Sequence, residues 1–422
     1  MSFFQSDLLP SCLKYCNDHL MMDDLALTDI AVEQATPFYC YSRNAIEQRL
    51  QVCLTAFKSV GASVHFAVKA NSNLSVLKLV AQAGVGADIV SGGELIRVIK
   101  AGIPSEKVIF SGVAKTDAEI AQAITAGVGQ FNIESAEELY RIDRISRRFN
   151  CKINAALRVN PEVEVGTHNH IATGKKGSKF GVTSNRLSEL FQASAEMPHI
   201  NLRGLAMHIG SQITSLEPYS EAIQKMRLWT EQLRAEGYEL DILDLGGGLG
   251  VDYGDGQCLE FMTYASLVRQ KLKGLNINTQ VELGRSLISD AGVLVASVVS
   301  TKIDEPRNFV MLDAGMNDFL RPALYQAAHL LVPAKIRHNN PIDRVNIVGP
   351  ICESTDFFLR DYLLPLPEEG DLMVFCMAGA YGAVQSSMYN SRTLIPEVMI
   401  EKNGFRVIRK PWTIEEQLAL EI

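Results

Sequence analysis

A lysine stands at the end of an apolar run near the start of the chain. Phe66, Ala67 and Val68 precede Lys69, and Asn71 follows. Burial of an ammonium group is costly, so a lysine here either extends to water or is held by a partner. Loss of solvent lowers a lysine pKa and makes the amine nucleophilic. Lys69 is therefore either a solvated strand-end residue or a candidate nucleophile.

A glycine cluster follows another apolar run, where residues 245–250 read LGGGLG. Stacked glycines after a strand let backbone N–H groups close on a phosphate, although they also make ordinary tight turns. The Gly-x-Gly-x-x-Gly dinucleotide motif is absent at this point, because Val251 and Tyr253 occupy the positions where its last glycine would stand.

Glu282 and Arg285 end a further run, in Glu282-Leu283-Gly284-Arg285. A carboxylate at such a position can keep a pyridine nitrogen protonated, which makes pyridoxal phosphate an electron sink. The simpler interpretation is an ion pair with the neighbouring arginine.

Three more segments carry reactive side chains. His208 ends an apolar run, where a histidine is more often a hydrogen-bonded core residue than a catalyst. Cys352 stands beside Glu353, so it is either an acid-base group or a small buried hydrophobe. Tyr381 lies among small residues, which permit the close approach of a ligand or mark a bend.

Short apolar runs alternate with helical patterns from about Phe38, which indicates a parallel sheet covered by helices. The runs are Val64–Ala70, Gly86–Ser91, Val108–Gly112, Gln130–Ser135, Ala155–Asn160, Leu202–Ser211, Ile242–Gly248 and Gln280–Arg285. Roughly eight such units predict a (β/α)8 barrel over residues 36–285. The polar segment Pro161–Gly181 is long enough to be functional.

Strand-like runs dominate after Arg285, and they predict a mainly β domain over residues 286–422, together with the N-terminal residues 1–35. Asn403-Gly404 lies between two such runs and predicts a hairpin. A helix is expected around Met316–His329. Lys69, His208, the glycines and Glu282-Arg285 all fall at the carboxyl ends of predicted strands, the face where barrel enzymes place their sites.

The composition excludes several classes of protein. The formal net charge of −8 argues against a nucleic-acid partner. No Cys-x-x-Cys pair occurs among the eight cysteines, so we expect reduced thiols in a cytoplasmic protein and no metal site. We expect neither a signal peptide nor a membrane span, because no apolar stretch is long enough.

The conjunction of motifs resembles a known family. FAVKAN, HIGSQ, GGGLG, ELGRS, MNDFLRPALY, GPICES and GAYGAVQSSMYNSR occur in this order, and they are similar to those of the diaminopimelate decarboxylases. These are fold-type III pyridoxal-phosphate enzymes, related to ornithine decarboxylase and more distantly to alanine racemase. The likeness runs from about Thr36 to about Pro396. It implies decarboxylation of meso-2,6-diaminopimelate to L-lysine and carbon dioxide, the last step of lysine biosynthesis.

The resemblance also implies roles for individual residues. Lys69 binds the cofactor aldehyde, His208 stacks on the cofactor ring, and Glu282 pairs with the pyridine nitrogen. Cys352 donates a proton from the partner subunit of a homodimer with shared active sites. Further cofactor contacts are implied for Asp88, Ser211, Gly246, Gly247, Gly248, Gly284, Arg285 and Tyr381, and substrate contacts for Arg285, Arg321, Tyr325, Glu353 and Tyr381.

One position departs from the family, which usually has proline where this chain has Leu283. Proline restricts φ, so we expect a looser turn with the roles of Glu282 and Arg285 kept.

Three alternatives remain at this stage. One is a related decarboxylase that acts on ornithine, arginine or a carboxylated polyamine. These substrates lack a second carboxylate next to the distal amine or place it differently, so Arg321 would have less to bind. A non-catalytic carrier of the cofactor has no need of Cys352. A racemase needs bases on both faces of the substrate, and the GPICES segment has no place in that chemistry.

Overall fold

Eight parallel strands close into a barrel in the computed structural model, which describes residues 8–165, 178–254, 256–304 and 307–422. They are β5 (Ala62–Ala67), β6 (Gly86–Ile89), β7 (Val108–Phe110), β8 (Gln130–Ile133), β9 (Ile153–Arg158), β10 (Ile200–Ala206), β11 (Ile242–Asp244) and β12 (Asn278–Leu283). Each strand pairs with the next along the chain, and β12 returns to pair with β5. The predicted barrel is confirmed, and each predicted apolar run overlaps one strand.

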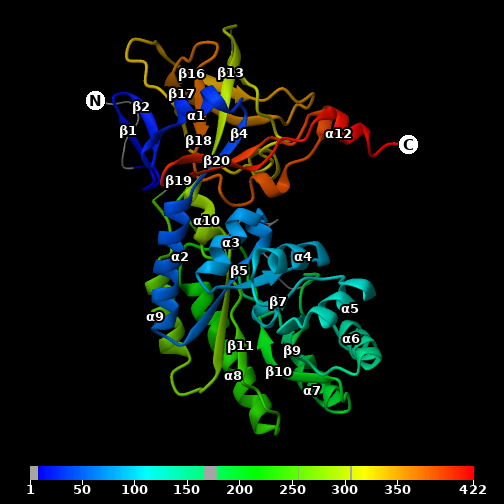
Figure 1. Cartoon of the computed structure of the whole chain (residues 1–422). Helices are drawn as coiled ribbons and strands as arrows, with labels where there is room; N and C mark the ends of the chain where they lie inside the picture. The colour runs from blue at the N-terminus through cyan, green and yellow to red at the C-terminus, as the bar shows by residue number, and fades with distance from the viewer. Residues whose placement is uncertain (1–7, 166–177, 255, 305–306) are drawn as a thin grey trace. The chain divides into compact units, whose positions relative to one another are not determined.

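Helices connect the strands and cover the outside of the barrel, as Figure 1 shows for α4, α5 and α6. The helices between the barrel strands are α3 (Leu74–Gln82), α4 (Gly92–Ala101), α5 (Asp117–Ala126), α6 (Ala136–Phe149), α7 (Leu187–Ala195), α8 (Glu217–Ala235) and α9 (Phe261–Lys271), while α2 (Arg43–Lys58) precedes the first strand and α10 (Arg285–Ile288) follows the last. Side chains of Asn73, Ser91, Thr116 and Ser135 cap α3 to α6, which explains where these helices begin. Across the described ranges, every helix is too short or too polar to cross a bilayer.

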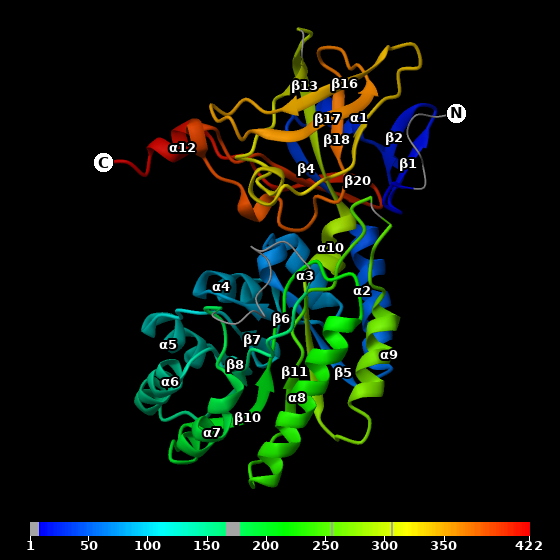
Figure 2. The same ribbon diagram turned by 180° about the vertical axis from the view of Figure 1, so that it is seen from behind.

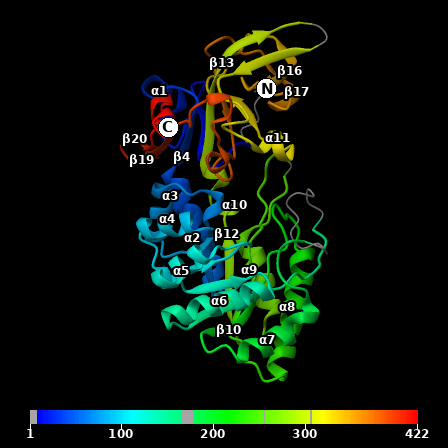
Figure 3. The same ribbon diagram turned by 90° about the vertical axis from the view of Figure 1, so that its right-hand side faces the viewer.

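A nine-stranded sheet forms the second part of the structure, in the order β17-β16-β14-β13-β4-β19-β20, with β15 and β18 attached through β13. Figures 2 and 3 show its strands from two further sides. The strands are β4 (Phe38–Ser42), β13 (Gly292–Lys302), β14 (Asn308–Leu312), β15 (Leu331–Pro333), β16 (Ile342–Val348), β17 (Phe357–Pro365), β18 (Leu372–Phe375), β19 (Glu397–Glu401) and β20 (Gly404–Arg409). A smaller sheet and three helices complete it: β1 (Leu13–Cys16), β2 (His19–Met22), β3 (Leu25–Ala26), α1 (Leu27–Glu33), α11 (Arg321–Tyr325) and α12 (Ile414–Leu418).

The chain divides into two compact units. Unit 1 comprises Met1–Gln48, Asp252–Gly256 and Ile288–Ile422, and contains the nine-stranded sheet. Unit 2 comprises Arg49–Val251 and Gln257–Leu287, and contains the barrel.

The strand β4 differs from the expectation that residues from 36 onward belong with the barrel. It pairs with β13 and β19 in the sheet of unit 1. All five of its residues are buried, so it has no alternating pattern that could distinguish a sheet strand from a barrel strand.

Two further expectations concern the second half of the chain. The hairpin is confirmed, although its loop is Lys402-Asn403 and Gly404 begins β20 at φ +130°. The helix expected around Met316–His329 is wrong in length. Only α11 forms, because Gln326 adopts the left-handed conformation at φ +53° and ends it.

Gly204 in β10 provides a test of how tightly the barrel strands pack. A Cβ at this position would lie 2.3 Å from the carbonyl oxygen of Ile242 in β11. Gly204→Ala is therefore expected to lower the free energy of unfolding by about 1–3 kcal/mol, measured by urea denaturation. Gly93→Ala in α4 is the control, because the nearest atom to its Cβ is 3.7 Å away. Equal stability of the two variants would contradict the close packing of β10 on β11.

Candidate active site

The predicted barrel residues gather at one rim. Lys69, His208 and Gly246 each stand two residues beyond the end of a strand, β5, β10 and β11 respectively. The carboxyl ends of parallel barrel strands meet at one face. The rim therefore brings together residues that lie far apart in the sequence.

Lys69 lies in a 3-10 turn over Val68–Ala70, directly after β5, rather than in the strand itself. Its Nζ donates to Oδ2 of Asp88 at 2.6 Å. The lysine side chain is 34% exposed, whereas that of Asp88 is fully buried. An ion pair, rather than burial, therefore holds this amine at the rim.

The glycine turn lies beside the end of β12. A Cβ on Gly247 would fall 1.9 Å from the carbonyl oxygen of Glu282, and one on Gly248 would fall 2.1 Å from that of Gly210. Gly246 and Gly248 also adopt positive φ, +64° and +96°. Only glycine fits at these positions, and the turn keeps its backbone open to a close ligand.

His208 is fixed in one tautomer by this turn. Its Nδ1 accepts a hydrogen bond from the backbone N–H of Gly247 at 3.2 Å, so the proton of the neutral ring is on Nε2. Burial, then the positive charges of Lys69 and Arg158, hold the pKa of His208 well below its ordinary value. The imidazole is therefore a neutral, flat group.

Glu282 lies in a buried carboxyl cluster that the sequence did not indicate. Its Oε1 accepts from Ser111 Oγ and from Asn132 Nδ2, both at 3.2 Å. Asn132 Nδ2 also donates to Oδ2 of Asp244 at 2.8 Å. Burial, followed by the charges of Asp244 and Asp88, raises the pKa of Glu282 well above its ordinary value. A cation placed here would favour the ionised form.

The last residues of this rim are arranged around the end of β12. A Cβ on Gly284 would lie 2.9 Å from that of Ala70, so its absence lets the turn that carries Lys69 pack closely. Arg285 Nη2 donates to Ser211 Oγ at 3.0 Å. Leu283 is buried and pairs with Phe66 in β5. Strand pairing therefore fixes the backbone where the family usually has proline.

The sequence analysis did not identify two charged residues of the rim, Arg158 and Glu134. Arg158 Nη1 donates to Oε1 of Glu134 at 2.7 Å, and Glu134 Oε2 accepts from the N–H of Gly181 at 2.9 Å. Both charged residues lie near the carboxyl ends of predicted strands, so the rule that identified Lys69 could also have found them. The long segment expected to be functional ends at Gly181, and its residues 166–177 lie outside the described ranges.

The remaining predicted residues belong to unit 1, where three motifs converge. Asp356 joins GPICES to MNDFLRPALY, because its carboxylate accepts from the N–H groups of Ile351 and Met316, both at 2.7 Å. The N–H of Ser387, in GAYGAVQSSMYNSR, donates to the carbonyl of Asn317 at 2.8 Å.

These side chains differ in exposure. Arg321 is buried, Tyr325 and Tyr381 are half-buried, and Cys352 and Glu353 are exposed. The N–H of Cys352 donates to Asn390 Oδ1 at 2.8 Å, and Glu353 accepts a short hydrogen bond from Tyr389. The thiol of Cys352 is thus presented at the surface of unit 1 on an ordered loop.

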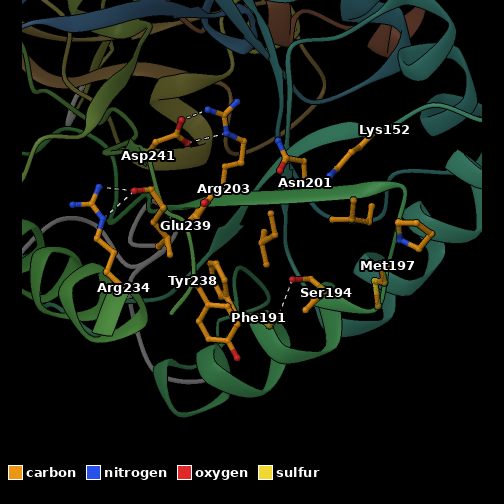
Figure 4. Close-up of a pocket in the computed structure, with 15 residues that line it drawn as sticks. Lys152, Phe191, Ser194, Met197, Asn201, Arg203, Arg234, Tyr238, Glu239 and Asp241 are labelled. Atoms are coloured by element: carbon orange, nitrogen blue, oxygen red, sulfur yellow. Dashed lines mark hydrogen bonds and ion pairs between the residues drawn. The ribbon is translucent and has the colours of Figure 1, made fainter. Parts of the chain in front are cut away.

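A hollow of about 710 Å³ lies at the opposite, amino-terminal end of the barrel strands. Figure 4 shows Arg203 and Asp241 pointing toward one another in an ion pair, and Phe191 beside Tyr238. Arg234 donates to the carbonyl oxygens of Leu240 and Leu275. The guanidinium groups are engaged within the fold, so we assign the hollow no part in the chemistry.

Comparison with known proteins identifies the family. Residues 43–292 match the family described as "Pyridoxal-dependent decarboxylase, pyridoxal binding domain". The diaminopimelate decarboxylase of Neisseria meningitidis serogroup A is 42% identical over 96% of this chain and 99% of its own length. That of Haemophilus influenzae is 40% identical over 100% and 99%. The chain belongs to the diaminopimelate decarboxylase family.

Solved structures of this family agree. Diaminopimelate decarboxylase from Helicobacter pylori, in complex with L-lysine, has a TM-score of 0.90 and 38% identity over 93% of this chain and 98% of its own. Diaminopimelate decarboxylase from m. jannaschii, also in complex with L-lysine, has a TM-score of 0.93 and 34% identity over 98% of both chains.

The residues present at the rim fit pyridoxal phosphate, the cofactor of this family. The amine of Lys69 lies beside the carboxylate of Asp88. The glycine turn has no Cβ atoms, so its backbone can approach a phosphate closely. Asp88 Oδ1 is buried and accepts no hydrogen bond from the described residues. A bound group with a donor at this place would satisfy it.

The glycine turn can be tested through cofactor affinity. Gly247→Ala pushes a Cβ against the carbonyl of Glu282, so the affinity for pyridoxal phosphate is expected to fall by about tenfold or more. Fluorescence titration of the cofactor-free protein measures it. Gly93→Ala again serves as control, and the unfolding temperatures of both apo variants separate a local effect from misfolding. Unchanged affinity of a folded Gly247→Ala variant would remove this turn from the cofactor site.

Proposed function

We propose that the protein decarboxylates meso-2,6-diaminopimelate to L-lysine and carbon dioxide with pyridoxal phosphate as cofactor. The observation that carries this proposal is the rim itself. Lys69 is paired with Asp88 next to a neutral His208 and a buried Glu282, in a chain that matches the diaminopimelate decarboxylases over nearly its whole length.

Lys69 is assigned as the residue that binds the cofactor aldehyde. The carboxylate of Asp88 keeps its amine in place, and neutral His208 offers a flat, uncharged face for the ring. Glu282 holds a proton on the pyridine nitrogen. The cofactor, when bound, supplies an electron sink for the pair that the departing carboxylate leaves behind.

The phosphate is assigned to the end of the barrel that carries the glycine turn. Backbone N–H groups of Gly246, Gly247 and Gly248 suit an anion. Further contacts are proposed from Ser211, Gly284, Arg285 and Tyr381. The hydrogen bond from Arg285 to Ser211 supports a shared position for these two.

The second carboxylate of the substrate is assigned to Arg321 together with Arg285 and Tyr325, while Glu353 and Tyr381 contact the distal amine end. Arg321 is a buried guanidinium, and Arg binds carboxylates in a bidentate manner. Ornithine and arginine have no second carboxylate, so this residue favours diaminopimelate over them.

Cys352 is assigned as the proton donor to the carbon that loses its carboxylate. We propose that it acts in the site of the partner subunit of a homodimer, while Lys69 serves its own subunit's site. The exposure of Cys352 and Glu353 on unit 1 supports such a donation, because a residue that completes another chain's site must reach its own surface.

Substrate assays with Arg321→Met test the activity and the assignment of Arg321 together. Carbon dioxide release is measured with meso-diaminopimelate, ornithine and lysine offered separately, and the wild-type chain should act on the first. Loss of a buried carboxylate partner costs about 2 kcal/mol or more, so Arg321→Met should raise KM about 30-fold.

Arg337→Met is the control for this variant, because Arg337 forms an exposed ion pair with Asp371. Its KM should stay that of the wild type. Faster turnover of ornithine than of meso-diaminopimelate by the wild-type chain would instead favour the related ornithine decarboxylases.

Mixed dimers test the shared site. Lys69→Ala and Cys352→Ala should each be nearly inactive alone. A mixed dimer carries both defects in one site and leaves the other intact, and random exchange makes about half of the dimers mixed, so roughly a quarter of the wild-type activity should return. The purified variants are mixed, exchanged in mild denaturant and assayed for carbon dioxide release. If exchange is demonstrated and activity does not return, Cys352 does not act across subunits.

A further inference from the structure

The chain turns back on itself after α11. This helix is only five residues long and ends at Gln326, whose left-handed conformation reverses the direction of the chain. His329 is thereby placed against Arg321, and the Nε of the arginine donates to Nε2 of the histidine at 3.1 Å. Both side chains are buried, at 5% exposure for Arg321 and 2% for His329.

A second hydrogen bond determines the protonation of this histidine. Its Nδ1 lies 3.0 Å from the carbonyl oxygen of Cys376. A carbonyl oxygen only accepts, so Nδ1 carries the ring proton and the lone pair of Nε2 accepts from Arg321. The imidazole is neutral and joins the backbone after β18 to the guanidinium of Arg321.

Aromatic rings hold the imidazole in this orientation. Phe319 packs edge-on against His329 with ring centroids 4.6 Å apart, and Tyr253 does so at 4.9 Å. The guanidinium of Arg321 lies over the ring of Tyr253 at 5.2 Å. The N–H of Cys376 donates to the carbonyl of Leu330 at 2.9 Å, which ties the histidine's own segment to the strand. Neither ring nor guanidinium can turn without breaking several of these contacts.

We propose that His329 is a positioning residue that orients Arg321 for the second carboxylate of the substrate. This inference rests on the proposed function. Because His329 binds the Nε edge of the guanidinium, a bidentate carboxylate has to meet Arg321 through the Nη1 and Nη2 atoms. A single orientation of the guanidinium then selects substrates by where their second carboxylate lies.

Two substitutions separate the two hydrogen bonds of His329. Glutamine can place an oxygen near the position of Nε2 and still accept from Arg321. Asparagine can place its N–H₂ near Nδ1 and donate to Cys376, but it cannot reach Arg321. Both variants lose the aromatic ring, so they form a matched pair.

The expected result is a rise in KM that only one variant shows. His329→Asn should raise KM for meso-diaminopimelate about tenfold, because a hydrogen bond to a charged group is lost, while kcat stays within about twofold. His329→Gln should keep KM within about threefold of the wild type. Inhibition by 1,5-diaminopentane, which has the same amines and no carboxylate, should be equal in the wild type and both variants.

Each other outcome overturns the inference in a recognisable way. Equal KM values in the two variants would show that the hydrogen bond from Arg321 to residue 329 has no role in substrate binding. If His329→Asn also weakened inhibition by the diamine or lowered the unfolding temperature, the role of His329 would be structural only. A wild-type chain that releases no carbon dioxide from meso-diaminopimelate would overturn the proposed function itself, whereas an active wild type with no difference between the variants overturns this inference alone.

Discussion

A closed barrel of parallel strands collects the carboxyl ends of all its strands at one rim, and the proposed chemistry depends on this constraint. Lys69 follows β5 and His208 follows β10, while Asp88 and Glu282 are the second-to-last residues of β6 and β12. No local interaction could bring these residues together, because the strands between them must first pair in order and close. Once closure has occurred, each side chain needs only to stand at the correct end of its strand.

The rim concentrates carboxyl groups in a place that water reaches poorly. Asp88, Asp244 and Glu282 are all buried, and the charges of the first two raise the pKa of the third. Lys69 compensates part of this charge through its ion pair with Asp88. A site of this kind favours a bound cation, and a protonated pyridine ring carries the charge that the buried carboxylates attract. Asn132 keeps Asp244 and Glu282 at a fixed separation.

In unit 1, hydrogen bonds to backbone and side-chain groups position the candidate side chains, whereas in the barrel the ends of the strands position them. Asp356 draws two loops together through backbone N–H groups, and neutral His329 connects Arg321 to the chain beyond β18. Loops without a regular ladder depend on such partners, because their backbone groups would otherwise be buried without hydrogen bonds. The reactive side chains of this unit are therefore placed by a few specific polar residues.

The sequence alone predicted the barrel and the candidate residues at its rim, because alternating strand and helix patterns and a lysine at the end of an apolar run are local signals. The tertiary structure decided which buried residues support them. Asn132 and Asp244 look like ordinary strand residues until closure of the barrel places them beside Glu282. The same holds for β4, which is buried on both faces, and for His329, which reaches Arg321 only because Gln326 ends the helix. These contacts depend on how distant strands pair and on one reversal of the backbone. Neither produces a periodic pattern of residues in the sequence.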